Sequence, residues 1–190
     1  MKAKFLSLVS AVCVFGSLAF AQEYIVDKAH SQVGFKIKHL QITNVNGKFK
    51  DYDAVIDFDK NKNIFNKLQA NIKIASVDTD NKTRDNHLQQ ADFFDSKKFP
   101  DMIFVMKKYK KEDNENGKVI GDLTISGVTK EVVLDTEIGG VAKGKDGKER
   151  IGFSMSGKIK RSNFNLAPKS SNIALGDDVK ISIEVEAYEK

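Results

Sequence analysis

Three histidines, His30, His39 and His87, are the side chains of this sequence best suited to acid–base or metal chemistry. Imidazole titrates near neutral pH and is a common metal ligand. The three histidines do not have the spacing of a helical metal motif, and the sequence offers no cysteine cluster to assist them. We therefore predict no metal site and a structural hydrogen bond at each histidine. An acid–base role for Asp27, His30 or His39 is the alternative.

Other chemistry-bearing patterns point away from catalysis and from nucleic acid. The sequence contains no Gly-x-Ser-x-Gly, phosphate-binding glycine loop or haem-attachment motif. The densest basic run, Lys107–Lys111, is followed by acidic residues at 112–115 that offset it. Without Lys2 and Lys4, 29 of the 31 basic residues face 26 acidic ones, so no nucleic-acid partner is predicted. Transient contact of the basic run with an anionic membrane is kept as a hypothesis.

The N-terminus has the pattern of a secretory signal peptide. Lys2 and Lys4 precede an uncharged run from Phe5 to Phe20, which ends in the small-x-small triplet of residues 19–21. The run is shorter than the roughly 20 residues of a membrane-spanning helix. We predict that residues 1–21 are cleaved and that residues 22–190 form a single secreted domain.

Alternating apolar and polar residues dominate the rest of the chain, which is typical of half-buried β-strands. The alternating apolar sets include 33/35/37, 68/70/72/74, 102/104/106, 151/153/155 and 179/181/183/185. No cysteine follows Cys13, so neither a disulfide nor a thiolate site is expected. The pattern predicts an all-β fold whose stability comes from packing.

One segment and two dipeptides interrupt this alternation of apolar and polar residues. Between Asp80 and Asp95, apolar residues recur at helical spacing and Asp80 is a suitable N-cap, so a helix is expected there. Asn116-Gly117 and Asp146-Gly147 are typical of tight hairpin turns. About eight strands with one helical insertion would form a closed antiparallel barrel or a sandwich. A barrel of that size is either filled by its side chains or holds one small ligand.

Several motifs in order resemble the YceI-like family. They are Tyr24-Ile25-Val26-Asp27 with His30-Ser31, Phe35 to Leu40, Gly47-Lys48-Phe49, Arg84 to Leu88 with Asp92 to Asp95 and Phe99-Pro100, Gly121 to Lys130, and Arg161 to Phe164. Together they span nearly all of residues 22–190. Asn163 and Asn165 depart from the aspartate and glycine common in the family, although asparagine tolerates a left-handed turn. A role that needs a negative charge at position 163 would not carry over.

The resemblance implies a closed, lipocalin-like antiparallel β-barrel of about eight strands with a helix, located in the periplasm. It also implies a long apolar tunnel that holds a polyisoprenoid or another long-chain amphiphile, without a cofactor. The candidate ligand contacts are Val33, Phe35, Ile37, Phe49, Ile72, Ile74, Phe93, Phe94, Phe99, Met102, Phe104, Met106, Leu123, Ile125, Phe153, Met155 and Phe164. His39, Arg84 and Arg161 are candidates for contact with a polar headgroup, since guanidinium suits phosphate geometry.

Three functions stay open at this point. The first is a carrier or sequestering protein for such a lipid, which we favour. The second is an enzyme that modifies the lipid through the acid–base residues above, and the third is a barrel with a filled interior that serves a structural or partner-binding role. A homodimer that hides an open barrel mouth is a further expectation.

Overall fold

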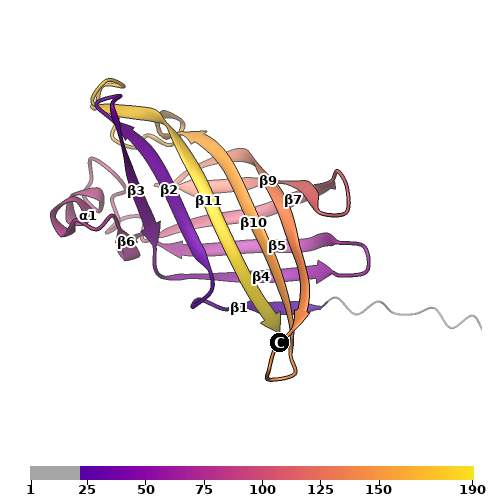
Figure 1. Cartoon of the computed structure of the whole chain (residues 1–190). Coiled ribbons are helices and arrows are strands. Elements are labelled where there is room, and N and C mark those ends of the chain that lie inside the picture. Colours follow the sequence, from indigo (N-terminus) through magenta and orange to yellow (C-terminus); the bar gives the residue numbers. More distant parts are fainter. Residues whose placement is uncertain (1–21) are drawn as a thin grey trace, which may run out of the picture.

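The structure, a computed structural model, describes residues 22–190, so the predicted signal peptide lies outside the described residues. Strands dominate it (Figure 1). In chain order the elements are β1 (Glu23–Val26), β2 (Gln32–His39), β3 (Thr43–Phe49), β4 (Tyr52–Asp59), β5 (Ile64–Lys73), the 3₁₀ turn η1 (Ile74–Ser76), β6 (Val77–Asp78), α1 (Lys82–Leu88), β7 (Asp101–Lys111), β8 (Asn116–Ile125), β9 (Val128–Lys143), β10 (Glu149–Lys160), η2 (Arg161–Phe164) and β11 (Leu175–Glu189).

These strands form one closed antiparallel barrel. The pairing runs β1–β4–β5–β7–β8–β9–β10–β11, and β11 pairs with β1 to close the ring. Three of the barrel strands are interrupted by a bend, beyond which β1 is continued by β2, β4 by β3, and β5 by β6. The pairing shows this, since β2 pairs with β11 and β3, and β3 pairs with β6. The barrel therefore has eight strands, three of which are bent. The predicted fold class is confirmed.

The three bends lie side by side. The backbone N–H of Lys50, in the β3–β4 link, donates to the carbonyl of Ser76, in the β5–β6 link, at 3.2 Å. Lys28, in the β1–β2 link, reaches Asp51 of the β3–β4 link at 3.3 Å. Beyond the bends β2 and β3 run at a steep angle to β4 and β5 (Figure 1). The bends thus redirect one side of the barrel together.

Helix α1 lies between β6 and β7 in the sequence. These two strands do not pair with each other, because β6 pairs with β3 and β7 pairs with β5 and β8. Asn81 accepts the N–H of Arg84 at 3.0 Å and is the N-cap, so the expectation of an Asp80 cap was wrong: Asp80 has φ of 57° and belongs to the preceding turn. The helix ends at Leu88, well before Asp95. Seven residues make a marginal helix without tertiary support. No helix within residues 22–190 has the length and apolar character needed to cross a bilayer.

Thr79 supplies that support. The carboxylate of Asp85 accepts both the N–H and the hydroxyl of Thr79, at 2.9 and 2.6 Å. Arg84 donates through Nε to the Thr79 hydroxyl and through a terminal nitrogen to its carbonyl, both at 2.7 Å. Arg84 and Asp85 therefore tie the helix to Thr79, directly after β6.

One end of the barrel is filled by large side chains. Phe65 lies 5.0 Å from Phe58, 4.9 Å from Phe153 and 5.4 Å from Tyr109, measured between ring centroids. Such tilted and edge-to-face pairs are favourable aromatic geometries. We call this region the packed end; it comprises Tyr24, Phe58, Phe65, Tyr109, Val119, Ile138, Ile151 and Ala187.

The two predicted turns had different outcomes. Gly147, with φ of +79°, lies in the β9–β10 turn, as predicted. Asn116-Gly117 is not a turn: both residues belong to β8, and Gly117 pairs with Lys111 of β7. The turn precedes it, because the carboxylate of Asp113 accepts the N–H of Asn116 at 2.7 Å and ends the loop there. A side-chain hydrogen bond thus replaced the asparagine–glycine turn.

Candidate ligand-binding cavity

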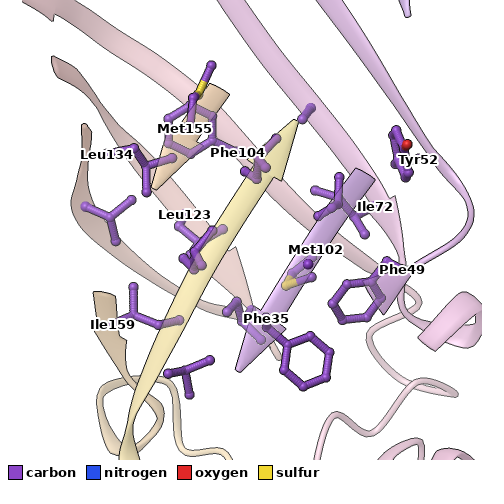
Figure 2. Close-up of a pocket in the computed structure, with 18 of the residues that line it drawn as sticks. Phe35, Phe49, Tyr52, Ile72, Met102, Phe104, Leu123, Leu134, Met155 and Ile159 are labelled. Atoms are coloured by element: carbon purple, nitrogen blue, oxygen red, sulfur yellow. The ribbon is translucent and has the colours of Figure 1, made fainter. Parts of the chain in front are cut away.

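The other end of the barrel contains a cavity of about 210 Å³. Its surface is almost wholly apolar, and Figure 2 shows side chains from opposite walls facing it. Engineered cavities of about 150 Å³ lined by similar residues stay dry and bind small hydrocarbons. The strands contribute the lining residues Val26, Val33, Gly34, Phe35, Ile37, Phe49, Tyr52, Asp53, Ala54, Ile56, Leu68, Ala70, Ile72, Met102, Phe104, Leu123, Ile125, Val132, Leu134, Phe153, Met155, Ile159, Leu175, Val179, Ile181, Ile183 and Val185.

Small side chains on neighbouring strands explain why this part of the barrel is not filled. Ala54 of β4 and Ala70 of β5 are paired directly, and both line the cavity. Further along the same two strands, Phe58 pairs with Phe65 at the packed end. Because side chains at paired positions share one patch of the barrel interior, exchanging two phenylalanines for two alanines leaves space between the walls.

Aromatic side chains and α1 form one wall. The rings of Phe35 and Phe49 lie 5.7 Å apart, and Phe49 lies 6.0 Å from Phe94, which follows α1. Phe93 also lines the cavity, and its ring meets His87 edge-on at 4.8 Å. Leu88 completes the contribution of this segment. The helix region therefore covers the cavity with side chains and does not merely flank the barrel.

Most of the predicted contact residues line this cavity, but four do not. Ile74 is fully buried in η1, where the bend turns it away from the lining, and Phe164 is buried in η2. Met106 stands at a register shift in the β7–β8 pairing, and Phe99 covers Gly127 in the β8–β9 turn. Alternation predicts the inward face only while a strand is regular, and each of these residues lies at a bend, a bulge or a loop.

Two kinds of lining residue are instructive among those that the sequence patterns did not assign to the site. The first is the inward face of β11, Val179 to Val185 in alternation, which the pattern had shown to be apolar but which was not assigned to the site. The second is the small residues Ala54 and Ala70. Their side chains are too small to fill the space between the walls, so a search for large apolar side chains could not find them. Pairing two alanines on adjacent predicted strands would have been the informative pattern.

Arg161 is a buried charged side chain in the cavity wall, with 3 % of its surface exposed. All five of its N–H groups have acceptors. Nε donates to the carbonyl of Gly176, one terminal nitrogen to those of Leu166 and Ala167, and the other to Ser170, Asn172 and Leu175, at 2.8 to 3.2 Å. The guanidinium therefore holds the loop of residues 165–175 to the barrel and has no N–H free for a headgroup.

The other two candidates for headgroup contact do not line the cavity. His39 is exposed at the end of β2, and Arg84 is engaged with Thr79 as described. Asp53 is in the lining, but its side chain is exposed and pairs with Lys28 at 3.2 Å. Within residues 22–190, the interior thus presents a nearly uniform hydrocarbon surface, with Arg161 fixed in its wall.

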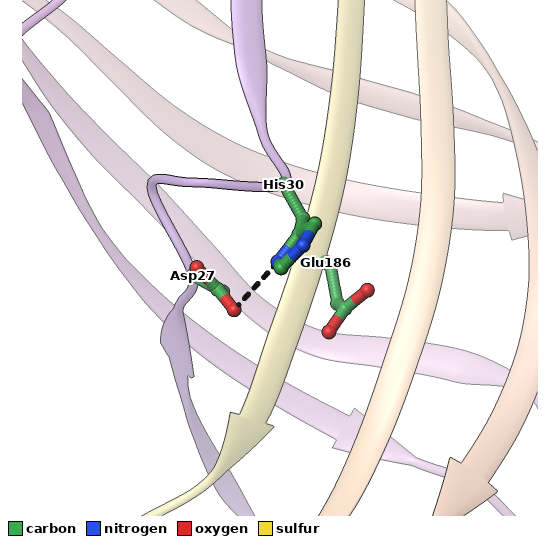
Figure 3. A group of neighbouring side chains, drawn as sticks. All are labelled: Asp27, His30 and Glu186. Carbon is green, nitrogen blue, oxygen red and sulfur yellow. Dashed lines mark hydrogen bonds and ion pairs between the residues drawn. The ribbon is translucent and has the colours of Figure 1, made fainter. Parts of the chain in front are cut away.

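Asp27, His30 and Glu186 meet on the outside of the barrel (Figure 3). The Nδ1 atom of His30 lies 2.9 Å from the carboxylate of Asp27, and one ligand atom from each of the three residues lies within 4.8 Å of the others. The Asp27 carboxylate raises the pKa of His30 above its ordinary value, and His30 lowers the pKa of Asp27. Arg150 reaches Glu186 at 3.0 Å and already supplies a cation there. None of the three titratable groups lines the cavity.

The sequence matches the model of the YceI-like domain over residues 24–187. The chain belongs to the YceI-like family. It is 42% identical over 180 residues to a UPF0312 protein of Photorhabdus laumondii, covering 92% of this chain and 91% of that protein. A UPF0312 protein of Staphylococcus epidermidis is 42% identical over 165 residues, covering 84% and 94%. The resemblance stated from the motifs is confirmed.

Solved structures agree with this YceI-like assignment. A Campylobacter jejuni YceI protein is 67% identical, with a TM-score of 0.77, covering 89% of this chain and 99% of that one. Burkholderia cenocepacia BcnA is 27% identical, with a TM-score of 0.74 and coverage of 85% and 98%. A Saccharophagus degradans domain described as polyisoprenoid binding has the same fold at 14% identity, with a TM-score of 0.68 and coverage of 89% and 99%.

Proposed function

We propose that this YceI-like protein is exported to the periplasm and holds a polyisoprenoid or another long-chain amphiphile in its apolar cavity, as a carrier or store. The observation that carries the proposal is the cavity itself, whose lining is almost wholly apolar. A filled interior would have left no room for a hydrocarbon chain. The shared fold of the Saccharophagus degradans domain is consistent with such a ligand.

Burial of hydrocarbon is sufficient to account for useful affinity. Each buried methylene contributes about 0.8 kcal/mol, so ten to fifteen would contribute roughly 8 to 12 kcal/mol before the cost of association. No specific polar contact is needed for this. We therefore expect affinity to increase with chain length and to discriminate poorly between chains of similar length.

The placement of the titratable groups favours binding over catalysis. The Asp27–His30 pair has the geometry for proton transfer, but it lies on the outer surface. A general base must come within about 3 Å of the proton that it removes, or act through one water. A lipid held between Ala70 and Phe35 would not meet this pair.

The proposal is tested with protein freed of endogenous lipid and a fluorescent long-chain probe. Ala70→Phe places an aromatic ring in the space that the paired alanines leave, so probe affinity should fall at least about tenfold, the equivalent of two lost methylenes. Val55→Phe, on the outward face next to Ala54, is the matched control and should bind as the wild type does. Native mass spectrometry of the untreated protein should show a co-purifying long-chain compound.

Two results would contradict the proposal. One is a purified protein that carries no lipid and binds no long-chain probe. The other is full probe binding by Ala70→Phe in a variant that unfolds at the same denaturant concentration as the wild type, since the probe would then be bound outside the cavity. A lipid that is chemically altered during incubation, with the change lost in His30→Ala, would favour the enzymatic alternative.

A further inference from the structure

Three aliphatic side chains are exposed together at the cavity end of the barrel. Ile42 is 81 %, Ile173 is 74 % and Leu40 is 49 % exposed. Leu40 and Ile42 belong to the β2–β3 turn, and Ile173 belongs to the loop before β11. The N–H of Leu40 donates to the carbonyl of Ala174 at 3.0 Å and joins the two segments. We call residues 40–42 and 169–174 the apolar tip. They lie side by side at the upper end of Figure 1.

The backbone of the β2–β3 turn is held in an unusual conformation to present these side chains. Leu40 and Gln41 have φ values of 51° and 61°. Consecutive positive φ values favour asparagine and glycine, and a bulky residue such as leucine rarely adopts them. Gln41 donates through Nε2 to the carbonyl of Asn172 and supports the arrangement from the neighbouring loop. A strained backbone that exposes an aliphatic side chain is a reason to look for a function there.

Exposed lysines surround the apolar tip. Lys36, Lys38 and Lys169 are exposed, and among the described residues they form no ion pair within 4 Å. Asp92, which pairs with His87, is an acidic neighbour of Lys169. Residues 36–50 and 161–176 contain no aspartate or glutamate. The basic run considered earlier is different, because Lys107 pairs with Asp122 at 2.7 Å and also with Glu131. The tip therefore combines exposed aliphatic side chains with exposed lysines that are not held in ion pairs.

The apolar tip is also next to the cavity. Ile37, three residues before Leu40, lines the cavity, and so does Leu175, two residues after Ile173. Leu166, in the same loop, lines it as well, and Arg161 fixes that loop. A surface bound by the tip would thus lie at the cavity end of the barrel and not at the packed end.

We propose that the apolar tip docks this protein on an anionic lipid bilayer, where the cavity takes up or releases its ligand. Aliphatic side chains that enter the headgroup–acyl boundary and lysines that meet anionic headgroups are the two contributions by which peripheral proteins bind membranes. This inference rests on the proposed function, since it gives the route by which an amphiphile reaches the cavity.

The test measures co-sedimentation of the full chain with vesicles of phosphatidylglycerol and phosphatidylcholine. The double variant Ile42→Ser/Ile173→Ser is compared with Val55→Ser/Val133→Ser, which removes two exposed aliphatic side chains from the barrel wall. The wild type and the wall variant should bind, and the tip variant should bind at least about tenfold more weakly. Binding should also weaken at high salt and on pure phosphatidylcholine.

Cavity binding is measured in parallel with the soluble long-chain probe, which the tip variant should bind as the wild type does. A wild type that binds the probe but not the vesicles overturns the membrane inference and leaves the proposed function standing. Equal vesicle binding by both double variants also overturns it. A wild type that forms a dimer, with Ile42→Ser/Ile173→Ser monomeric, would show that a second copy of the chain covers the tip instead.

Discussion

The two ends of this barrel are built from the same strands and differ in what meets inside them. At the packed end Phe58, Phe65 and Tyr109 form an aromatic cluster, and Phe153, which also lines the cavity, packs against Phe65. At the cavity end the same β4–β5 pair carries alanines. There β6 and β7 do not pair with each other, and side chains of α1 and of the loop after it cover the cavity. Large side chains therefore meet across the interior at the packed end, whereas the walls stay apart at the cavity end. Dense packing and open cavity are thus separated along the barrel axis.

The largest expected effect is a difference in stability between the same substitution at the two ends. Phe65→Ala removes the centre of the aromatic cluster and should lower the free energy of unfolding by about 3–5 kcal/mol. Phe35→Ala removes a side chain whose one face already borders the cavity, so it should cost less than the roughly 3 kcal/mol at which the range for buried phenylalanines begins. Urea unfolding of lipid-free protein measures both values. Equal losses would mean that the cavity end is packed as densely as the other.

A second comparison separates the structural role of Arg161 from contact with a headgroup. Arg161→Lys leaves several carbonyls of the 165–175 loop without a donor, so we expect a loss of about 2–4 kcal/mol in the free energy of unfolding. Arg84→Lys, which disturbs two hydrogen bonds to Thr79, should cost about 1 kcal/mol. Denaturant titration measures both. An unchanged stability for Arg161→Lys with selective loss of anionic probes would restore the headgroup role.

The smallest effect concerns the outer face of the barrel. Asp27 raises the pKa of His30, so the His30–Asp27 contact is favourable below the ordinary histidine value of about 6.5 and is lost as the pH rises through the raised pKa. At the acid side, the contact is lost as the pH falls through the lowered pKa of Asp27. An NMR titration should show the His30 pKa falling towards its ordinary value in Asp27→Asn. Asp92→Asn, the partner of His87, is the control and should leave the His30 titration unchanged.

If probe affinity changes along with the protonation of His30, the outer cluster is coupled to the cavity and the division between the two is incomplete. Constant affinity across the same pH range is the expected result. The structural reason is that neither Asp27, His30 nor Glu186 lines the cavity.

Much of the fold followed from local patterns. The alternation at Val33, Phe35 and Ile37 placed these side chains inside the barrel, and the structure agrees. The family resemblance, which rested on ordered motifs such as Gly121 to Lys130, was confirmed over nearly the whole described chain. One local pattern failed because another local contact competed with it: the hydrogen bond from Asn116 to Asp113, three residues earlier, set the position of the β7–β8 turn, and Asn116-Gly117 became strand.

The sequence by itself determined which side chains face inward, because the two-residue period of a strand fixes its faces wherever the strand is regular. It did not determine that Ala54 and Ala70 stand opposite each other or that three bends align. Nor did it determine that the guanidinium of Arg161 is hydrogen-bonded to the carbonyls of the 165–175 loop. Those features depend on strand register and on contacts between residues distant in sequence. Whether inward-facing side chains meet or leave a cavity is decided by the distance between opposite walls, and only the closed barrel sets that distance.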